Sequence, residues 1–369
     1  MPSSRSKPAR WQYHARRQGT AACIPFSSRP AAPLDLINRK ILLAARPVGL
    51  PKETDWELTE SPVAEPSDGE VVVRAAYLSI DPAMRGWMNA RRSYTAPVEI
   101  GAVMRARGAG EVVASRDPAF SVGDRVSGWL GIQEYATLAG HELAKVDTAL
   151  APLPVWLNAL GIPGFTAYFG LRDIGRPEPG DTVVVSGAAG AVGGMVGEIA
   201  KLLGCRAVGI AGGSAKCRHV VDELGFDAAI DYKSEDVGEA LRHHCPDRID
   251  VYFDNVGGEI LDAALSHLAM HARVVICGAI SQYNGERPTP GPSNYMALLV
   301  QRASMTGFLV GDFADRFADA VNELARWLSD GKLRSVEDYA YGLETFPEAL
   351  LRLFRGDNLG KLILAVAQT

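Results

Sequence analysis

Apolar and polar residues follow two different patterns along this chain. In its first part, apolar and polar residues alternate in short stretches separated by turn residues, as in the strands of an antiparallel sheet. From residue 183 onward, short continuous apolar runs alternate with segments of helical length, which is typical of a buried parallel sheet. The chain is therefore predicted to form a barrel-like, mostly antiparallel β domain and an α/β domain. The antiparallel strands are expected at 70–78, 110–114, 125–129 and 134–139.

The α/β part is predicted to contain a doubly wound parallel sheet. Gly204 and Gly225 end two of its helices, and apolar strands recur between the helical segments. Six strands with crossover helices form a Rossmann-type domain, in which ligands bind at the carboxyl ends of the strands. Strands are expected at 183–185, 207–211, 228–230, 249–253, 273–277 and 305–310, and helices at 190–203, 215–224, 237–244, 259–268 and 313–328. The residues expected to face the ligand crevice are Asp254, Asn255, Gly278, Ala279 and Phe308.

The first strand of the α/β part runs into a loop of small residues, VVVSGAAGAVG at 183–193. Without large side chains, a diphosphate can reach the backbone N–H groups at the start of the next helix, where the helix dipole is positive. Gly190 and Gly193 allow a tight turn and close packing of helix on strand. A buried strand-to-helix turn without a ligand has the same local pattern, but the α/β context favours a dinucleotide site.

The end of the second strand predicts which dinucleotide is bound. An acidic residue there selects NAD through the ribose hydroxyls, but residues 207–216 read AVGIAGGSAK and contain no carboxylate. Ser214 and Lys216 could donate to a 2′-phosphate and neutralise it. The sequence therefore favours NADP(H), the alternative being that Lys216 is an ordinary solvated lysine.

Several further motifs carry a resemblance to a known family. They are GIPGFTAY at 161–168, the glycine loop, FDNVGG at 253–258, CGAISQYN at 277–284 and GDNLGK at 356–361. In this order they resemble the zinc-free medium-chain dehydrogenases/reductases, in the branch of the prostaglandin and leukotriene reductases, 2-alkenal reductases and curcumin reductase. The resemblance covers about residues 38–369. It implies a GroES-like catalytic domain and NADPH-dependent reduction of the carbon–carbon double bond of α,β-unsaturated aldehydes and ketones.

The domain division follows from a strand expected at 361–366, which is too isolated to form a domain and should return to the first domain. The barrel-like catalytic domain is predicted at 38–162 and 336–369, and the Rossmann NADP-binding domain at 163–335. Residues 1–34 hold six basic and no acidic residues, as organelle targeting segments do. Their scattered prolines and the lack of an apolar helical face instead favour a disordered N-terminal extension, predicted at 1–37, or translation from an upstream start codon. The active site is expected between the two domains.

Position by position, the resemblance implies a set of site residues. Tyr283 matches the tyrosine that contacts the substrate carbonyl, where it would stabilise the negative charge of an enolate. The implied cofactor-binding residues are Gly190, Ala191, Val192, Gly193, Lys216, Tyr232, Asn255, Cys277, Gly278, Ala279, Ile280, Ser281, Phe308, Leu309, Val310 and Asn358. The side chain of Cys277 is itself expected to be a small buried apolar group.

One position departs from the family pattern. Many members carry an aromatic residue where this chain has Ala83, within SIDPAMRGW at 79–87. A substrate contact is then missing or is supplied by another group, such as Trp87 or Tyr94. Ala83 therefore leaves the identity of the substrate open.

Zinc catalysis is not predicted, although zinc alcohol dehydrogenases share this architecture. Their metal needs an early thiolate and histidine, and the early cysteine here is Cys23, in an atypical leader. The remaining cysteines lack metal-ligand spacing, and Gly140-His141-Glu142 follows the barrel strands rather than preceding them. No metal ligands are therefore assigned.

Charge and composition restrict the partners. The formal net charge of −5 argues against a nucleic-acid surface, and no uncharged apolar run is long enough for a membrane span. Five cysteines without a paired pattern indicate a reducing compartment, so a cytoplasmic location is expected. The family resemblance implies a homodimer joined through the cofactor domains, and the strand expected at 305–310 could pair across a twofold axis.

Three functions remain open from the sequence. The preferred hypothesis is an NADPH-dependent enone or enal reductase. The same hydride geometry would serve a quinone reductase or a secondary-alcohol dehydrogenase that acts on a lipid-like substrate. A non-enzymatic NADPH-binding protein is the third hypothesis, which Ala83 favours and Tyr283 disfavours.

Overall fold

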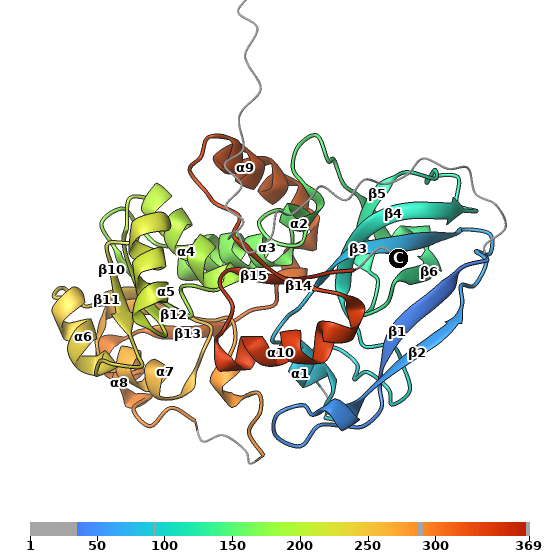
Figure 1. Ribbon diagram of the computed structural model, residues 1–369. Helices are drawn as coiled ribbons and strands as arrows, with labels where there is room; N and C mark the ends of the chain where they lie inside the picture. Colours follow the sequence, from blue (N-terminus) through green and yellow to red (C-terminus); the bar gives the residue numbers. More distant parts are fainter. Residues whose placement is uncertain (1–34, 92, 287–290, 367–369) are drawn as a thin grey trace, which may run out of the picture.

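The computed structural model describes residues 35–91, 93–286 and 291–366. The predicted disorder of the N-terminal extension falls almost entirely outside these ranges. Figure 1 shows two lobes side by side, with the last part of the chain, drawn in red, running between them. We call them the β lobe (residues 37–145 with 337–366) and the α/β lobe (residues 162–329). No helix within the described ranges is long and apolar enough to cross a membrane.

The β lobe contains a seven-stranded sheet among its described residues, in the order β14-β15-β3-β4-β5-β7, with β6 also paired to β3. All pairs are antiparallel except β14 with β15, and β1 and β2 form a separate antiparallel pair. Its elements are β1 (Ile37–Leu43), β2 (Trp56–Pro62), β3 (Glu70–Ser79), α1 (Met84–Trp87), β4 (Arg107–Ser115), β5 (Arg125–Trp129), β6 (Tyr135–Ala139), β7 (Leu143–Lys145), β14 (Glu337–Tyr341), α10 (Phe346–Arg355) and β15 (Lys361–Ala365).

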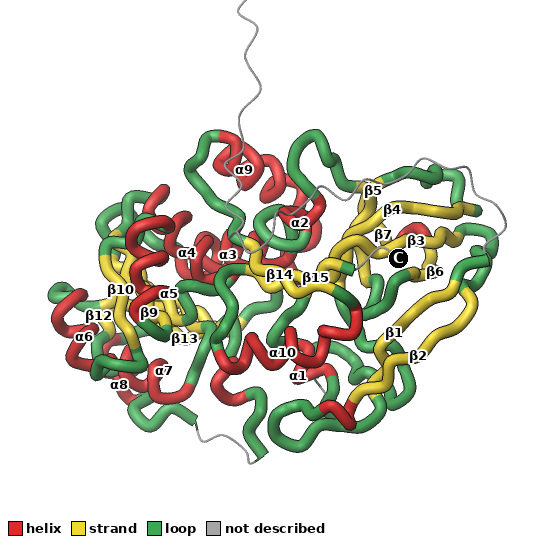
Figure 2. The backbone as a smooth tube through the Cα atoms, viewed as in Figure 1, coloured by secondary structure: helices red, strands yellow, loops and turns green. Residues whose placement is uncertain are grey.

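The α/β lobe contains a six-stranded sheet within the described residues, in the order β10-β9-β8-β11-β12-β13, and every pair is parallel. The chain starts in the centre and winds outward in both directions, so the predicted doubly wound sheet is confirmed. Figure 2 shows helices packed against these strands. The elements are α3 (Ile162–Phe169), β8 (Thr182–Ser186), α4 (Ala191–Leu202), β9 (Arg206–Ala211), α5 (Ser214–Arg218), β10 (Ala228–Asp231), α6 (Val237–His244), β11 (Ile249–Asp254), α7 (Gly258–Leu265), β12 (Leu268–Ile276), α8 (Met296–Gln301), β13 (Ser304–Gly307) and α9 (Phe317–Ser329).

Predicted boundaries in two parts of this lobe are wrong. The helix expected at 259–268 ends at Leu265, and β12 begins at Leu268 rather than at residue 273. Leu268 and Ala272 are four residues apart and both buried, a spacing that also fits a helix. The edge strand β13 ends at Gly307, and a 3₁₀ helix at Val310–Arg316 precedes α9. An edge strand pairs on one side only, which leaves its end poorly specified by pattern.

A short helix, α2 (Leu153–Trp156), and the segment after α9 connect the two lobes. β14 and β15 return to the sheet of β3, so the last part of the chain belongs to the β lobe. The boundaries at 162 and 335 stay a prediction. Lys361, at the start of β15, is 2% exposed and donates to the Ile80 carbonyl oxygen at 2.8 Å and to Asp81 at 2.6 Å. This buried pair joins the returning strand to the end of β3.

Candidate active site

The loop between β8 and α4 brings a helix start and a strand end into close contact. Gly187 has φ +63°, which favours glycine, and a Cβ on Gly193 would lie 2.3 Å from the Gly187 carbonyl oxygen. The first amide groups of α4 have no carbonyl of a preceding turn to bind, so they stay available to an anion. The predicted group at 190–193 therefore has the geometry of a phosphate cradle.

The returning C-terminal segment completes this cradle. The Gly360 N–H donates to the Ala189 carbonyl oxygen at 2.8 Å, and Gly360 and Gly190 form an isolated parallel bridge. Asn358, a predicted site residue, donates through Nδ2 to the Gly360 carbonyl oxygen at 2.9 Å. The structure thus brings Asn358 beside the glycine loop, although the two are far apart in sequence.

Two lysines and a tyrosine surround the loop after β9. A Cβ on Gly212 would lie 2.9 Å from the Tyr232 hydroxyl oxygen and 3.0 Å from Cε of Lys233. Burial lowers the pKa of Lys216, and the charge of Lys233 lowers it further. The structure therefore brings together the predicted Lys216 and Tyr232, and it adds Lys233. Sequence analysis missed Lys233, whose only signal was its place directly after Tyr232.

Asp254 differs from its predicted place in the crevice. It is 1% exposed, and its Oδ1 accepts from the Ser186 hydroxyl at 2.9 Å and from the Tyr252 hydroxyl at 3.0 Å. The same oxygen accepts from the Gly257 N–H at 3.0 Å, so Asp254 organises the loop from behind. The next residue, Asn255, donates through Nδ2 to the Ser186 carbonyl oxygen at 2.7 Å and packs against Gly187. Asn255 therefore borders the glycine loop, and its contact with the cofactor stays a prediction.

Tyr283 lies in the loop after β12, the segment that contains most of the predicted site residues. Its hydroxyl oxygen accepts from the Ala279 N–H at 3.2 Å, and a Cβ on Gly278 would lie 3.0 Å from it. The accepted bond leaves the hydroxyl proton free for donation. Burial is the main cause that raises the pKa of Tyr283, and Tyr94 of the β lobe is among the groups that raise it further. The phenol is therefore neutral at neutral pH.

The neighbouring residues of this loop fasten it to the loop after β11. The Ile280 N–H donates to the Asn255 carbonyl oxygen at 3.2 Å, and the Ser281 hydroxyl donates to the Val256 carbonyl oxygen at 2.6 Å. Burial raises the pKa of the Cys277 thiol to about 12, so this thiol stays protonated. Its predicted role as a small apolar group agrees with its contact to the hydrophobic core.

The last group of predicted cofactor residues lies between β13 and the following 3₁₀ helix. Phe308 points into the core, where a Cβ on Gly170 would lie 2.5 Å from its ring. That Phe308 faces the crevice stays a prediction, and its backbone is a group available there. Leu309 is exposed, and Val310 begins the 3₁₀ helix.

The β lobe supplies aromatic residues at the position opposite Tyr283. Ala83 packs against the β-lobe core, and Trp87 of α1 donates through Nε1 to the Tyr94 hydroxyl at 3.3 Å. Trp87 also packs edge-to-face on Trp129 of β5, with ring centroids 5.8 Å apart. Sequence analysis named Trp87 and Tyr94 as replacements for the missing aromatic residue but missed Trp129, because β5 is separated from α1 by β4 and its flanking loops.

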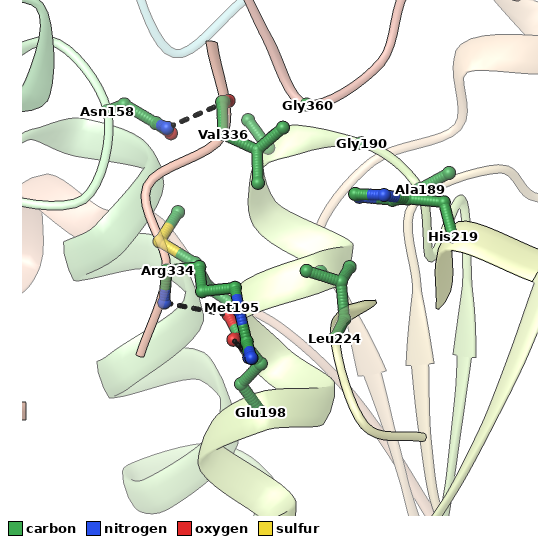
Figure 3. A pocket seen from close by; sticks show the side chains of 12 residues that line it. Asn158, Ala189, Gly190, Met195, Glu198, His219, Leu224, Arg334, Val336 and Gly360 are labelled. Carbon is green, nitrogen blue, oxygen red and sulfur yellow. Dashed lines mark hydrogen bonds and ion pairs between the residues drawn. The ribbon is translucent and has the colours of Figure 1, made fainter. Parts of the chain in front are cut away.

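A small cavity lies behind the glycine loop, next to the connection between the lobes (Figure 3). Its space of about 10 Å³ is close to the minimum for one water molecule. Asn158, 1% exposed, lines it and leaves its Oδ1 without a partner within the described ranges. Glu198 of α4 accepts from the Arg334 guanidinium at 3.3 Å. Burial raises the pKa of Glu198 to about 8, although Arg334 acts in the opposite direction. Neither group was found by sequence analysis.

Among the described residues, no three His, Cys, Asp or Glu side chains come together as a candidate metal site. His141, which the sequence analysis considered, lies in a short 3₁₀ helix between β6 and β7.

Comparisons with known proteins agree with this geometry. Two family profiles match, one described as "N-terminal domain of oxidoreductase" over residues 39–146 and one described as "Zinc-binding dehydrogenase" over residues 191–326. "NADPH-dependent curcumin reductase" of Escherichia coli (strain K12) is 42% identical over 336 residues, which is 89% of this chain and 97% of that protein. "2-alkenal reductase (NADP(+)-dependent)" of Nicotiana tabacum is 39% identical over 340 residues, 90% of this chain and 99% of that protein.

A solved structure, "Crystal structure of CurA in complex with NADPH from Vibrio vulnificus", superposes with a TM-score of 0.86 at 42% identity and covers 90% of this chain and 100% of that chain. The fold and the site thus define an NADP(H)-dependent oxidoreductase with two lobes. The chain belongs to the zinc-free medium-chain dehydrogenase/reductase family, in the branch of the curcumin, 2-alkenal and prostaglandin reductases. The glycine cradle and the paired lysines fit a cofactor with a diphosphate and a 2′-phosphate.

Proposed function

We propose that this enzyme reduces the carbon–carbon double bond of α,β-unsaturated aldehydes and ketones with NADPH. The observation that carries the proposal is the Tyr283 hydroxyl. It accepts from the Ala279 N–H and keeps its own proton to donate, in the loop of predicted cofactor residues and near Tyr94 of the β lobe. A donor of this kind stabilises an enolate oxygen, which the reduction of an enone requires.

The residues of the chain would have the following roles in this reaction. When bound, the cofactor supplies a hydride, which the substrate accepts at its β-carbon. Tyr283 holds the carbonyl oxygen and stabilises the negative charge that builds there. The cradle at 190–193, with Asn255 and Asn358, fixes the position of the cofactor, and Trp87 and Tyr94 reduce access of water from the β lobe. The other predicted cofactor residues keep their proposed contacts, with Phe308 acting through its backbone.

The test compares 2-alkenals, aryl enones and quinones as substrates while the loss of NADPH absorbance is followed. We expect turnover of enones and enals with NADPH far above that with NADH. Turnover of quinones alone would support the quinone reductase instead, and NADPH binding without any turnover would support a non-enzymatic protein.

Tyr283→Phe provides the matched variant, because it removes only the hydroxyl. We expect kcat to fall about 100-fold, as for the loss of one oxyanion donor, with NADPH affinity nearly unchanged in calorimetry. Tyr295→Phe, at an exposed tyrosine, is the control. An equal loss of turnover and cofactor affinity in Tyr283→Phe would place this residue in cofactor binding.

We also propose a homodimer joined through the α/β lobes. β13 ends the six-stranded sheet, and the neighbouring helix α8 exposes Met296, Leu299 and Val300. An open strand edge beside exposed apolar side chains supports pairing across a twofold axis. Light scattering should give twice the mass of the chain, and Leu299→Glu should lower it; a monomer at all concentrations would contradict the proposal.

The cellular location is a separate proposal. Five cysteines without a paired pattern support a cytoplasmic location, which fractionation of cells would test.

A further inference from the structure

Arg107 has an unusual environment among the arginines of the β lobe. It is half-buried, yet within the described residues it has no hydrogen bond and no ion pair. The guanidinium of Arg85 in the same lobe, by contrast, donates to the Gly49 carbonyl oxygen at 3.0 Å and to Oδ1 of Asn89 at 2.7 Å. A half-buried guanidinium without a protein partner has lost hydration without replacing it.

The nearest carboxylate does not satisfy Arg107. Burial lowers the pKa of Arg107, and the charge of Asp81 raises it, so Asp81 lies within electrostatic range. Asp81, however, is bound to Lys361 at 2.6 Å and accepts from the Ser79 hydroxyl at 2.6 Å. Asp81 therefore pairs directly with Lys361, and its charge offsets the burial of Arg107 only in part.

The guanidinium of Arg107 is held in place by an aromatic ring. Arg107 and Trp129 are direct partners in the pairing of β4 with β5, so their side chains are on the same face of the sheet. The guanidinium carbon lies 5.2 Å from the centre of the Trp129 ring. Stacking of this kind fixes the plane of the guanidinium and leaves its N–H edges free for a planar anion.

A series of aromatic contacts leads from this arrangement to the proposed catalytic position. Ala109, two residues along β4 and thus on the same face as Arg107, packs with Leu157, which follows α2 at the connection between the lobes. Trp129 contacts Trp87, and Trp87 is hydrogen-bonded to Tyr94. Tyr94 is the β-lobe residue whose charge acts on Tyr283. A second guanidinium, that of Arg105, lies 5.7 Å from the Trp87 ring and donates to the Ala96 carbonyl oxygen at 2.9 Å, beside a surface hollow of about 420 Å³.

We propose that Arg107, stacked on Trp129, is a carboxylate-binding subsite, and that the preferred unsaturated carbonyl substrates carry a carboxylate remote from the double bond. This inference rests on the proposed function. A carboxylate accepts two parallel N–H bonds from a guanidinium, which the free edge of Arg107 can supply. Trp129 would contact the planar part of the substrate beside that group.

The experiment compares two substrates that differ only in charge: an aryl enone with a para-carboxylate and its methyl ester. With the unaltered enzyme, we expect kcat/KM for the acid to exceed that for the ester about 10- to 100-fold, mainly through KM, as for a charge-assisted hydrogen bond. Arg107→Met should abolish this preference and leave the ester unaffected. Arg107→Lys should keep part of it, because a lysine retains the charge but not the paired geometry. Arg116→Met, at an exposed arginine of the same lobe, is the matched control.

A binding measurement separates this proposal from the proposed function. The saturated acid, which cannot be reduced, should quench tryptophan fluorescence in the unaltered protein and not in Trp129→Phe or Arg107→Met. Equal kcat/KM for acid and ester, unchanged in Arg107→Met, would overturn the subsite and leave the reductase intact. If neither enone is reduced, the proposed function fails. Quenching by the saturated acid then still shows whether the carboxylate-binding subsite exists. Absence of quenching would then overturn it as well.

Discussion

The two lobes build their candidate sites in different ways. In the α/β lobe, the site consists of loops that follow successive strands of one sheet, and backbone groups and small residues form much of it, as at 187–193. In the β lobe, the site consists of large side chains from α1, β4, β5 and the loop near Tyr94, which packing alone brings together. The glycine loop of the α/β lobe is therefore local in the sequence, although Asn358 and Gly360 complete it from a distance, whereas the β-lobe part of the candidate site depends on tertiary contacts throughout.

The largest effect is expected at the contact that joins the returning strand β15 to the end of β3 within the β lobe. Lys361→Met leaves Asp81 without its buried partner, so we expect the free energy of unfolding to fall by about 3–5 kcal/mol in denaturant titrations. The double substitution Lys361→Met with Asp81→Asn should recover part of the lost stability, because the unpaired charge of Asp81 is removed. Lys332→Met, at an exposed ion pair, is the control. An unchanged midpoint in Lys361→Met would show that this pair does not hold β15 to the end of β3.

A pH-dependent effect is expected at Glu198, behind the cofactor cradle. Its pKa of about 8 in the folded protein lies above its ordinary value of 4.5, so its stabilising contribution is complete below pH 4.5 and is lost as the pH rises through 8. Glu198→Gln should remove a slope of about 1.4 kcal/mol per pH unit between these values. Unfolding measured across this range checks it, with Glu65→Gln at an exposed site as the control. Identical slopes in both proteins would contradict the raised pKa.

A smaller effect on stability, together with a large loss of NADPH affinity, is expected for a substitution of Gly193. The added methyl group of Gly193→Ala would lie 2.3 Å from the Gly187 carbonyl oxygen, which costs about 1–3 kcal/mol and displaces the cradle. Calorimetry should show weakened NADPH binding. Gly311→Ala, where a Cβ meets nothing within 4 Å, should bind normally. Normal binding by Gly193→Ala would show that this close approach does not shape the cradle.

The smallest effects are expected for substitutions of Lys216 and Lys233, and they concern the affinity for NADPH. Lys216→Ala should weaken NADPH binding about tenfold and spare NADH, since only NADPH carries the 2′-phosphate. Lys233→Ala should act in the same direction but less strongly, because Lys233 is the more exposed of the two. Dissociation constants for both nucleotides provide the measurement. An unaltered preference in Lys216→Ala would place phosphate recognition elsewhere.

The same contrast explains what could be predicted from the sequence. The order of the parallel strands and the cradle at 190–193 were predictable, because strand, glycine loop and helix are adjacent in the chain. The Lys361–Asp81 pair joins residues 280 positions apart, and Arg107 meets Trp129 only through the pairing of β4 with β5. The direction of the Phe308 side chain depends on close packing at Gly170, which no local pattern records.

The central claim is that hydride passes from NADPH to the β-carbon of an enone held by Tyr283. It is tested most directly by reducing an aryl enone with NADPH deuterated at the transferable position of C4 and locating the label by NMR. The account predicts a saturated ketone with deuterium at the β-carbon and an intact carbonyl group. Deuterium on the carbonyl carbon of an allylic alcohol, or no transfer to any enone, would contradict it.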